Sequence, residues 1–150
     1  MTEFEYRCFE GELPCEDLGQ VVALNQEIFG FNETAEQLAY MFSTAQQPLS
    51  CLAFQDGCLV GFKIGFQQSK GVFESWRGGV QERLRGQGIA TELMRQQHIW
   101  CKEKSFKLIK TTTNSDNAPM LIANLLNGFQ IVGTFVNQRN KLKVLLEKSL

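Results

Sequence analysis

The chain has few of the residues that indicate a metal site, a disulfide framework or a linker. Its 150 residues include one histidine, three prolines and five scattered cysteines without a C-x-x-C pair. Because structural zinc needs four clustered Cys or His ligands, metal binding is not expected. No Pro/Gly/Ser-rich stretch or internal repeat divides the sequence, so we expect one domain over residues 1–150. Cys51 and Cys101 have apolar neighbours and are expected to be buried, with a reactive thiol as the alternative.

The sequence also lacks an excess of either charge and a long hydrophobic run. Fifteen Lys and Arg against sixteen Asp and Glu give a formal net charge of −1, so nucleic acid is not an expected partner. No apolar run approaches the roughly 18 residues of a membrane span, so no membrane partner is expected. The opening residues MTEFE are acidic where a signal peptide is basic, and we predict a cytoplasmic protein.

The hydrophobic periodicity predicts an α/β domain with a mixed sheet, in the order β-α-α-β-β-β-α-β-α-β-β. Expected strands are residues 4–9, 49–54, 58–66, 72–80, 107–113, 129–136 and 141–147, and expected helices are residues 18–30, 34–45 and 88–104. A fourth, short helix is expected after a cap at Ser115 or Asp116 and ends at Asn127-Gly128. Thr34 and Gln37 form a capping-box pattern, and Asp56-Gly57 indicates a hairpin. Gly78-Gly79 predicts a bulge or a close approach of another group to the strand.

The informative stretch is the loop that joins the 72–80 strand to the 88–104 helix. Glycines at 86 and 88 let backbone N–H groups point at a ligand, and the helix start adds the positive end of its dipole. This arrangement predicts an anion site, to which Arg83 and Arg85 add charge, and the alternative is an ordinary tight turn. A P-loop requires Gly-Lys-Ser/Thr and a dinucleotide fold requires a third glycine, and neither is present.

This stretch resembles the acyl-CoA-binding segment of the GNAT superfamily of N-acetyltransferases. The superfamily pattern is Arg/Gln-x-x-Gly-x-Gly/Ala between a strand and a helix, and Arg83, Gly86 and Gly88 match it. Downstream, Asn117 and the Gly128-Phe129 pair that ends a short helix also agree. The resemblance covers roughly residues 72–130, whereas the first 70 residues match by the order of elements alone.

The resemblance implies acetyl-CoA as cofactor and a sheet splayed between the fourth and fifth strands. Its pyrophosphate is expected on the backbone of Arg85, Gly86, Gln87, Gly88, Ile89 and Ala90. The pantetheine arm is expected to pair like an extra strand beside Gly79 and Val80. Asn117 is expected either to bind the arm or hold the gap open, or simply to cap a helix.

The resemblance also suggests which residues transfer protons and where the acceptor binds. An ammonium has no free lone pair at pH 7, so a base is needed, and Glu74 is the only acid on its strand; the alternative is a solvated strand residue. His98 lies some 15 Å along its helix from the phosphate end and is not favoured. Many relatives place a general-acid Tyr where this chain has Asn124, which at best donates a hydrogen bond to the sulfur.

The acceptor site is expected at Phe29, Phe31 and Glu33, with Asn32 and the 137–140 turn nearby; the alternative is that these aromatics belong to the core. The sequence therefore predicts an acetyl-CoA-dependent N-acetyltransferase that acts directly, in a ternary complex, on a primary amine of a small molecule or peptide. Two alternatives stay open. Asn124 would suit a non-catalytic acyl-CoA-binding or regulatory domain, and a purely structural glycine loop would bind no CoA. A homodimer through edge strands is plausible, and a monomer nearly as much so.

Overall fold

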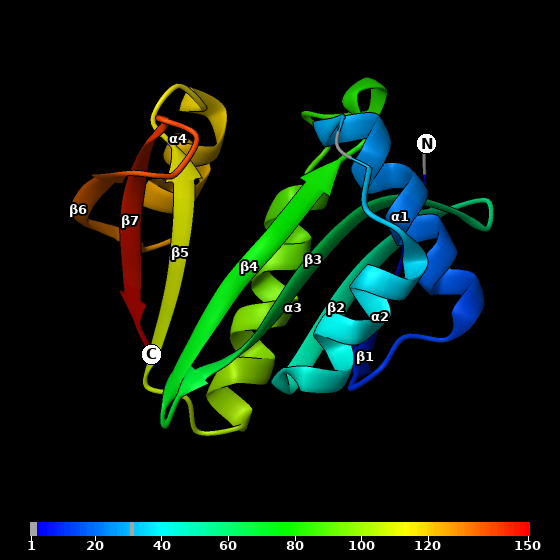
Figure 1. Ribbon diagram of the computed structural model, residues 1–150, viewed down its shortest axis with the longest axis horizontal. Helices are drawn as coiled ribbons and strands as arrows, with labels where there is room; N and C mark the ends of the chain where they lie inside the picture. The colour runs from blue at the N-terminus through cyan, green and yellow to red at the C-terminus, as the bar shows by residue number, and fades with distance from the viewer. Residues whose placement is uncertain (1–2, 31) are drawn as a thin grey trace.

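Residues 3–30 and 32–150, which the computed structural model describes, form a seven-stranded mixed sheet with helices on both faces (Figure 1). The strands are β1 (Glu5–Glu10), β2 (Gln46–Gln55), β3 (Cys58–Ser69), β4 (Val72–Val80), β5 (Leu108–Asn114), β6 (Gln130–Val136) and β7 (Leu142–Ser149). The helices are α1 (Cys15–Phe29), α2 (Ala35–Thr44), α3 (Ile89–Glu103) and α4 (Ala118–Leu126), with a short 3₁₀ turn, η1 (Glu82–Leu84). The predicted fold class and element order are confirmed.

The strands lie in the order β1-β2-β3-β4-β5-β7-β6. All neighbours are antiparallel except β4 and β5, which run parallel and are connected through α3. Helices α1 and α2 cover one face of β1–β4, and α3 covers the other. No helix among the described residues is long and apolar enough to cross a membrane.

Two hydrophobic clusters hold these layers together. On one face, Leu38 and Phe42 of α2 and Val21 and Leu24 of α1 pack against the sheet. On the other face, α3 contributes residues such as Leu93 to a cluster that continues into β5 and β7. Because α3 contacts both parts of the sheet, it bridges the place where the sheet divides.

The sheet divides between β4 and β5, as the resemblance predicted. The two strands pair from Val72 with Leu108 to Ser75 with Thr111, and no pairing follows. Figure 1 shows β4 and β5 diverging from this short ladder into a V, which we call the fork. In the upper half of β4, residues 77–80 pair with β3 and with no other strand of the described residues.

The bulge expected at Gly78-Gly79 lies instead at Trp76. The β3–β4 register moves from Gly65 opposite Ser75 to Ile64 opposite Arg77, which leaves Trp76 unpaired. A bulge sharpens the local bend and twist of a strand, so its position at the first residue beyond the ladder suits the separation of β4 from β5.

The two glycines serve close packing. They pair regularly with Lys63 and Phe62 of β3. A Cβ on Gly79 would lie 2.9 Å from Ile28 Cδ1 of α1, and a Cβ on Gly78 would lie 3.4 Å from Lys63 Cγ. The close approach predicted for this pair is thus made by α1 at Gly79 and, at Gly78, by the backbone of β3, where the Phe62 carbonyl oxygen lies 3.1 Å from the Cβ position.

Strand β2 begins three residues earlier than predicted, at Gln46. Pro48, expected to precede the strand, lies inside it. The register shift between Gln46 and Leu49 and the positive φ of Gln47 accommodate the proline, which has no N–H to donate to the ladder.

Candidate active site

The loop before α3 presents an uncapped helix start. Gly86 and Gly88 have φ of +81° and +84°, a left-handed conformation that strains any residue with a Cβ. Among the described residues, no protein group accepts a hydrogen bond from the N–H groups of residues 86–91. Space around both glycines is open. These free donors and the dipole of a 15-residue helix make a site for a polyanion such as a diphosphate.

The two arginines expected to add charge turn in different directions. Arg85 Nε donates to the Val80 carbonyl at 3.2 Å, so this side chain folds back over the end of β4. Arg83 lies toward the β2–β3 hairpin, with its Nη2 3.5 Å from Gln55 Oε1. The donors available at the start of α3 are therefore the backbone N–H groups of residues 86–91, rather than these guanidinium groups. Ile89 is buried against Gly61 of β3 and anchors the helix start to the sheet.

The base of the fork is closed by side chains of β5 and α4. Thr111 Oγ1 donates to the Ser75 carbonyl at 3.1 Å, at the last pair of the ladder. Two residues further along β5, Thr113 Oγ1 accepts from Asn124 Nδ2 at 3.2 Å, and both side chains are buried. Asn124 therefore lies beside β5 at the fork, and its amide is already bonded to Thr113.

Glu74 lies in the ladder, two residues before the bulge. Its neighbours Phe73 and Ser75 are buried on the face that α3 covers, so Glu74 points to the opposite face, which carries α1 and α2. Burial raises the pKa of the half-buried Glu74 carboxyl, and Lys110, opposite it on β5, partly counteracts this rise. A carboxylate with a raised pKa accepts a proton more readily than an exposed one.

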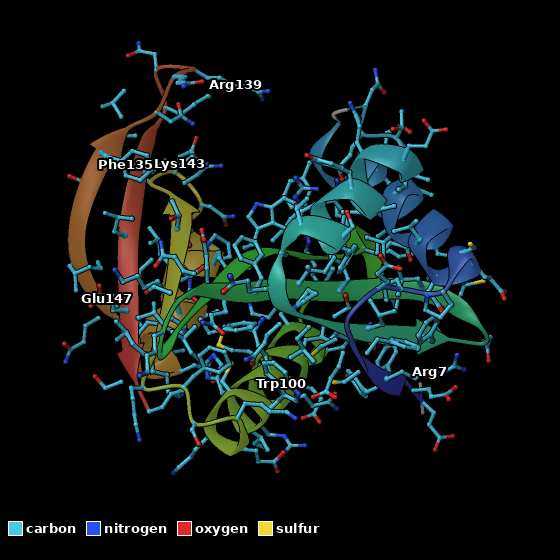
Figure 2. All side chains as sticks on the ribbon, turned by 60° about the horizontal axis from the view of Figure 1, so that its bottom comes forward. Arg7, Trp100, Phe135, Arg139, Lys143 and Glu147 are labelled. Atoms are coloured by element: carbon cyan, nitrogen blue, oxygen red, sulfur yellow. The ribbon has the colours of Figure 1, made fainter. Side chains whose placement is uncertain are left out.

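A polar cavity of about 570 Å³ opens at the mouth of the fork on the α1/α2 side. It is lined by Asn32, Glu33, Gln37, Arg77 and Arg139. The segment between α1 and α2 and the β6–β7 turn, more than 100 residues apart in the chain, meet there. Figure 2 shows Arg139 at the tip of the β6–β7 hairpin. The acceptor region predicted around Glu33 and residues 137–140 thus borders a single cavity.

One wall of this cavity is a largely buried ion pair. Arg77 Nη1 donates to Glu33 Oε1 at 2.7 Å, and the two side chains are only 19% and 18% exposed. The guanidinium also lies 3.9 Å from the centre of the Trp76 ring, in cation–π geometry. The pair ties the α1–α2 segment to the half of β4 that borders the fork.

The remaining predicted site residues differ in where they lie and in what they contact. Phe29 is 45% exposed at the end of α1, with its ring close to Gly79, so it is a rim residue rather than core. Phe31 lies outside the described residues. Asn117, rather than Ser115 or Asp116, caps α4, since its Oδ1 accepts from the Met120 N–H at 3.3 Å. The capping alternative is therefore observed, and the Asn117 side-chain nitrogen is left for other partners.

The sequence did not reveal the positions of three residues around the fork, which are Lys63, Arg77 and His98. His98 is 8% exposed, its Nδ1 lies 3.0 Å from Lys148 Nζ, and burial and nearby lysines lower its pKa to about 3. A strand lysine and a helix histidine carry no local signal of their position. Only the packing of α3 over β3 and β7 brings them to one place.

Comparisons with known proteins agree with this geometry. A sequence profile described as the acetyltransferase (GNAT) family matches residues 18–122, more than half of the chain. No curated protein sequence matches significantly.

Among solved structures, Ard1 from Thermoplasma volcanium superimposes with a TM-score of 0.83 at 17% identity, covering 98% of this chain and 97% of that one. An N-acetyltransferase from Staphylococcus aureus Mu50 gives 0.81 at 19% identity, covering 99% of each chain. The PaiA N-acetyltransferase from Thermoplasma acidophilum, solved in complex with coenzyme A, gives 0.75 at 17% identity and also covers 99% of each. These likenesses show the fold, the matched profile shows the family, and the chain belongs to the GNAT acetyltransferases.

Proposed function

We propose that the protein transfers the acetyl group of acetyl-CoA to a primary amine of a small molecule or peptide. The observation that carries this proposal is that two hydrogen-bonding surfaces of the backbone lie next to each other. The free N–H groups of residues 86–91 lie at the same end of β4 as its unpaired edge, residues 76–80. One surface suits a diphosphate, and the other suits an extended amide-containing arm that pairs as a strand would.

The residues present fit acetyl-CoA. Positive φ at Gly86 and Gly88 turns their amides toward one side, and no Cβ obstructs the space above them. The edge of β4 near Gly79 and Val80 offers backbone groups to the arm, except that Arg85 occupies the Val80 carbonyl. Bound acetyl-CoA supplies an activated thioester carbonyl for attack by a neutral amine.

Cofactor and acceptor would approach from opposite faces of the sheet. The helix start that suits the diphosphate belongs to α3, whereas the polar cavity is bordered by the α1–α2 segment. The fork connects the two faces, so both substrates can be present together. This arrangement supports direct transfer in a ternary complex, with no covalent acyl-enzyme.

Glu74 is the proposed general base. It points to the α1/α2 face, from which the amine would come, and its raised pKa makes it a better proton acceptor than an exposed carboxylate. Glu33 and Arg77 form the cavity wall and would position the acceptor rather than take its proton, because they are already paired with each other.

One observation favours a second candidate, an acyl-CoA-binding domain without efficient transfer. Asn124 stands where many relatives have a tyrosine, and its amide is bonded to Thr113. An amide does not protonate a thiolate. The two candidates share the cofactor site and differ in whether the thiolate receives a proton.

Calorimetric titration with acetyl-CoA, desulfo-CoA and ADP tests the shared site, and a panel of primary amines with detection of released CoA tests transfer. We expect micromolar binding, about −8 kcal/mol, and release of CoA that depends on the amine. Binding without release would favour the second candidate. Absence of binding at millimolar acetyl-CoA would overturn both.

A further inference from the structure

Lys63 of β3 is a lysine on an interior face of the sheet. Its neighbours in the strand on that face are Gly61 and Gly65. Ile89 and Leu93 of α3 pack over Gly61, and the Phe73 ring packs over Gly65. Lys63 therefore emerges between these two points, on the side of the sheet that α3 covers.

The side chain leans from β3 onto β4. Lys63 is paired with Gly78, and the position of a Cβ on Gly78 lies 3.4 Å from Lys63 Cγ. A side chain at 78 would therefore contact the lysine stem as well as the Phe62 carbonyl oxygen, 3.1 Å away. Gly78 belongs to the half of β4 that does not pair with β5, so the stem lies beside the strand that borders the fork.

The charge at this position has no partner in the protein. Among the described residues, no carboxylate lies within ion-pair distance of Lys63. Burial lowers its pKa to about 8, yet the residue is not fully enclosed, so solvent reaches it. An unpaired interior charge is costly, and its presence points to an anion that arrives from outside.

Other polar atoms around it are also without partners. Ser75 Oγ, both amide atoms of Gln97 and His98 Nε2 are buried and unbonded. These three side chains are 4%, 0% and 8% exposed. Because Lys148 donates to His98 Nδ1, the ring proton lies on Nε2, which is then a donor without an acceptor. The α3 side of the sheet near the fork thus holds buried polar atoms without partners. Among the described residues, no carboxylate forms an ion pair with Lys63 there.

We propose that the Lys63 ammonium is the general acid of the reaction, stabilising and protonating the thiolate of coenzyme A as the acetyl group leaves. This inference rests on the proposed function, since it requires acetyl-CoA in the fork. It identifies a proton donor for the thiolate in a chain that has Asn124 where many relatives have a tyrosine. The amide of Asn124 on α4 cannot provide this proton, and the Lys63 ammonium on β3, beside Gly78, can.

The bonds and protons balance as follows. The neutral amine nitrogen forms a bond to the thioester carbonyl carbon, and the C–S bond breaks with its electron pair on sulfur. Sulfur takes a proton from the Lys63 ammonium and becomes the thiol of CoA. The acetylated nitrogen loses one proton to Glu74. When product leaves, Glu74 releases its proton to solvent and Lys63 takes one from solvent, so both groups return to their starting state.

The first test measures a bound thiol and requires no turnover. After calorimetry has established CoA binding to each variant, the ultraviolet absorbance of the thiolate is followed against pH, with desulfo-CoA as the blank. In the unmodified protein the apparent pKa of the bound thiol should fall about 1 unit or more below that of free CoA. Lys63→Met should abolish this shift, Lys63→Arg should keep it, and Lys102→Met, an exposed position on α3, should leave it unchanged.

The second test is the alkaline side of the pH–rate profile. The titratable groups around Lys63 are Cys51 of β2, Cys101 and His98 of α3, and Lys148 of β7. The hydrogen bond with Cys8 and burial raise the pKa of Cys51, burial raises that of Cys101 to about 12, and His98 stays neutral above its pKa of about 3. Burial lowers the pKa of both lysines, that of Lys63 to about 8. In the unmodified protein, kcat should fall as pH rises through about 8, where Lys63 loses its proton.

Arginine variants distinguish the two lysines. Lys63→Arg should lower kcat and move the alkaline fall to above about pH 10, because a guanidinium stabilises the thiolate by its charge but does not give up its proton. Lys148→Arg should leave both kcat and the fall in place. An unshifted bound thiol in the unmodified protein, or the same thiol pKa in Lys63→Met, would overturn the inference while leaving the proposed function intact. Failure to bind CoA at all would overturn both, and calorimetry identifies that case first.

Discussion

Two glycines of this chain allow a matched comparison of strain and function. Gly86 and Gly57 both have φ near +80°, and open space surrounds the position of a Cβ at each. Gly86 lies in the loop before α3, whereas Gly57 lies in the β2–β3 hairpin. We expect Gly86→Val and Gly57→Val each to lower the free energy of unfolding by about 1–2 kcal/mol, the cost of a left-handed residue with a Cβ.

Acetyl-CoA binding should separate the two variants. Gly86→Val should lose binding in calorimetry, because the amides of the loop no longer converge, and Gly57→Val should retain the affinity of the unmodified protein. Equal loss in both variants would mean that strain, rather than the loop, controls binding. Urea denaturation supplies the stability measurement.

Glu74 should determine the acidic side of the activity profile. Its pKa lies above the ordinary carboxyl value because of burial, so the base form is lost as pH falls through that raised value. Glu74→Gln should reduce kcat by about 10²-fold or more and remove this acidic decline, with acetyl-CoA affinity unchanged. Glu36→Gln, an exposed change on α2, is the control. An acidic decline that persists in Glu74→Gln would exclude this residue as the base.

At the scale of elements, the start of α4 decides between two roles of Asn117. Its side-chain oxygen caps the helix through the Met120 N–H, while its nitrogen is left for other partners. Asn117→Asp keeps the acceptor and removes the donor, whereas Asn117→Ala removes both. We expect Ala to lower the free energy of unfolding by about 1 kcal/mol and Asp to preserve it.

The cofactor affinity of the same variants tests the second role. If capping is the whole role, Asn117→Asp binds acetyl-CoA as tightly as the unmodified protein. A tenfold or larger weakening in Asn117→Asp with unchanged stability would show that the side-chain nitrogen donates to the bound arm.

Elements with strong local signals were predictable from the sequence. Thr34 and Gln37 form the capping box that the pattern indicated, and Gly88 precedes a long amphipathic helix at the expected residue. The order of elements and the splay also agree, because loop glycines and hydrophobic periodicity are encoded over a few neighbouring residues.

Features that depend on packing between distant elements were not predictable. The bulge lies at Trp76 rather than at the glycines, which instead allow the close approach of α1 at Gly79 and of the β3 backbone at Gly78. Arg77 finds Glu33 across 44 residues of sequence. The interior position of Lys63 follows from which face α3 covers, and alternation within β3 does not reveal that.

At the scale of the whole molecule, the sheet ends in an open edge at β6. This strand pairs with β7 and carries exposed apolar side chains, including Ile131, Val132 and Val136. Unpaired backbone groups beside exposed apolar side chains support the homodimer that was considered plausible from the sequence. The dimer stays a prediction, as does the cytoplasmic location.

Sedimentation tests the dimer. We expect a species of about twice 17.0 kDa at micromolar concentration, and Val136→Lys on β6 should convert it to monomer. Tyr40→Lys, an equally accessible change on α2, should leave the mass unaltered. A monomer at every concentration in the unmodified protein would exclude the dimer.

The place of β7 between β5 and β6 has a consequence for biosynthesis. Residues 142–149 are the last strand in the chain, yet they supply the partner for all of β6 and for one side of β5. On the ribosome, β1 to β4 can pair as soon as they emerge, whereas β5 and β6 keep unpaired edges until residues 142–149 have emerged. The nascent protein therefore passes through a stage in which two strands expose edges that can pair with another chain.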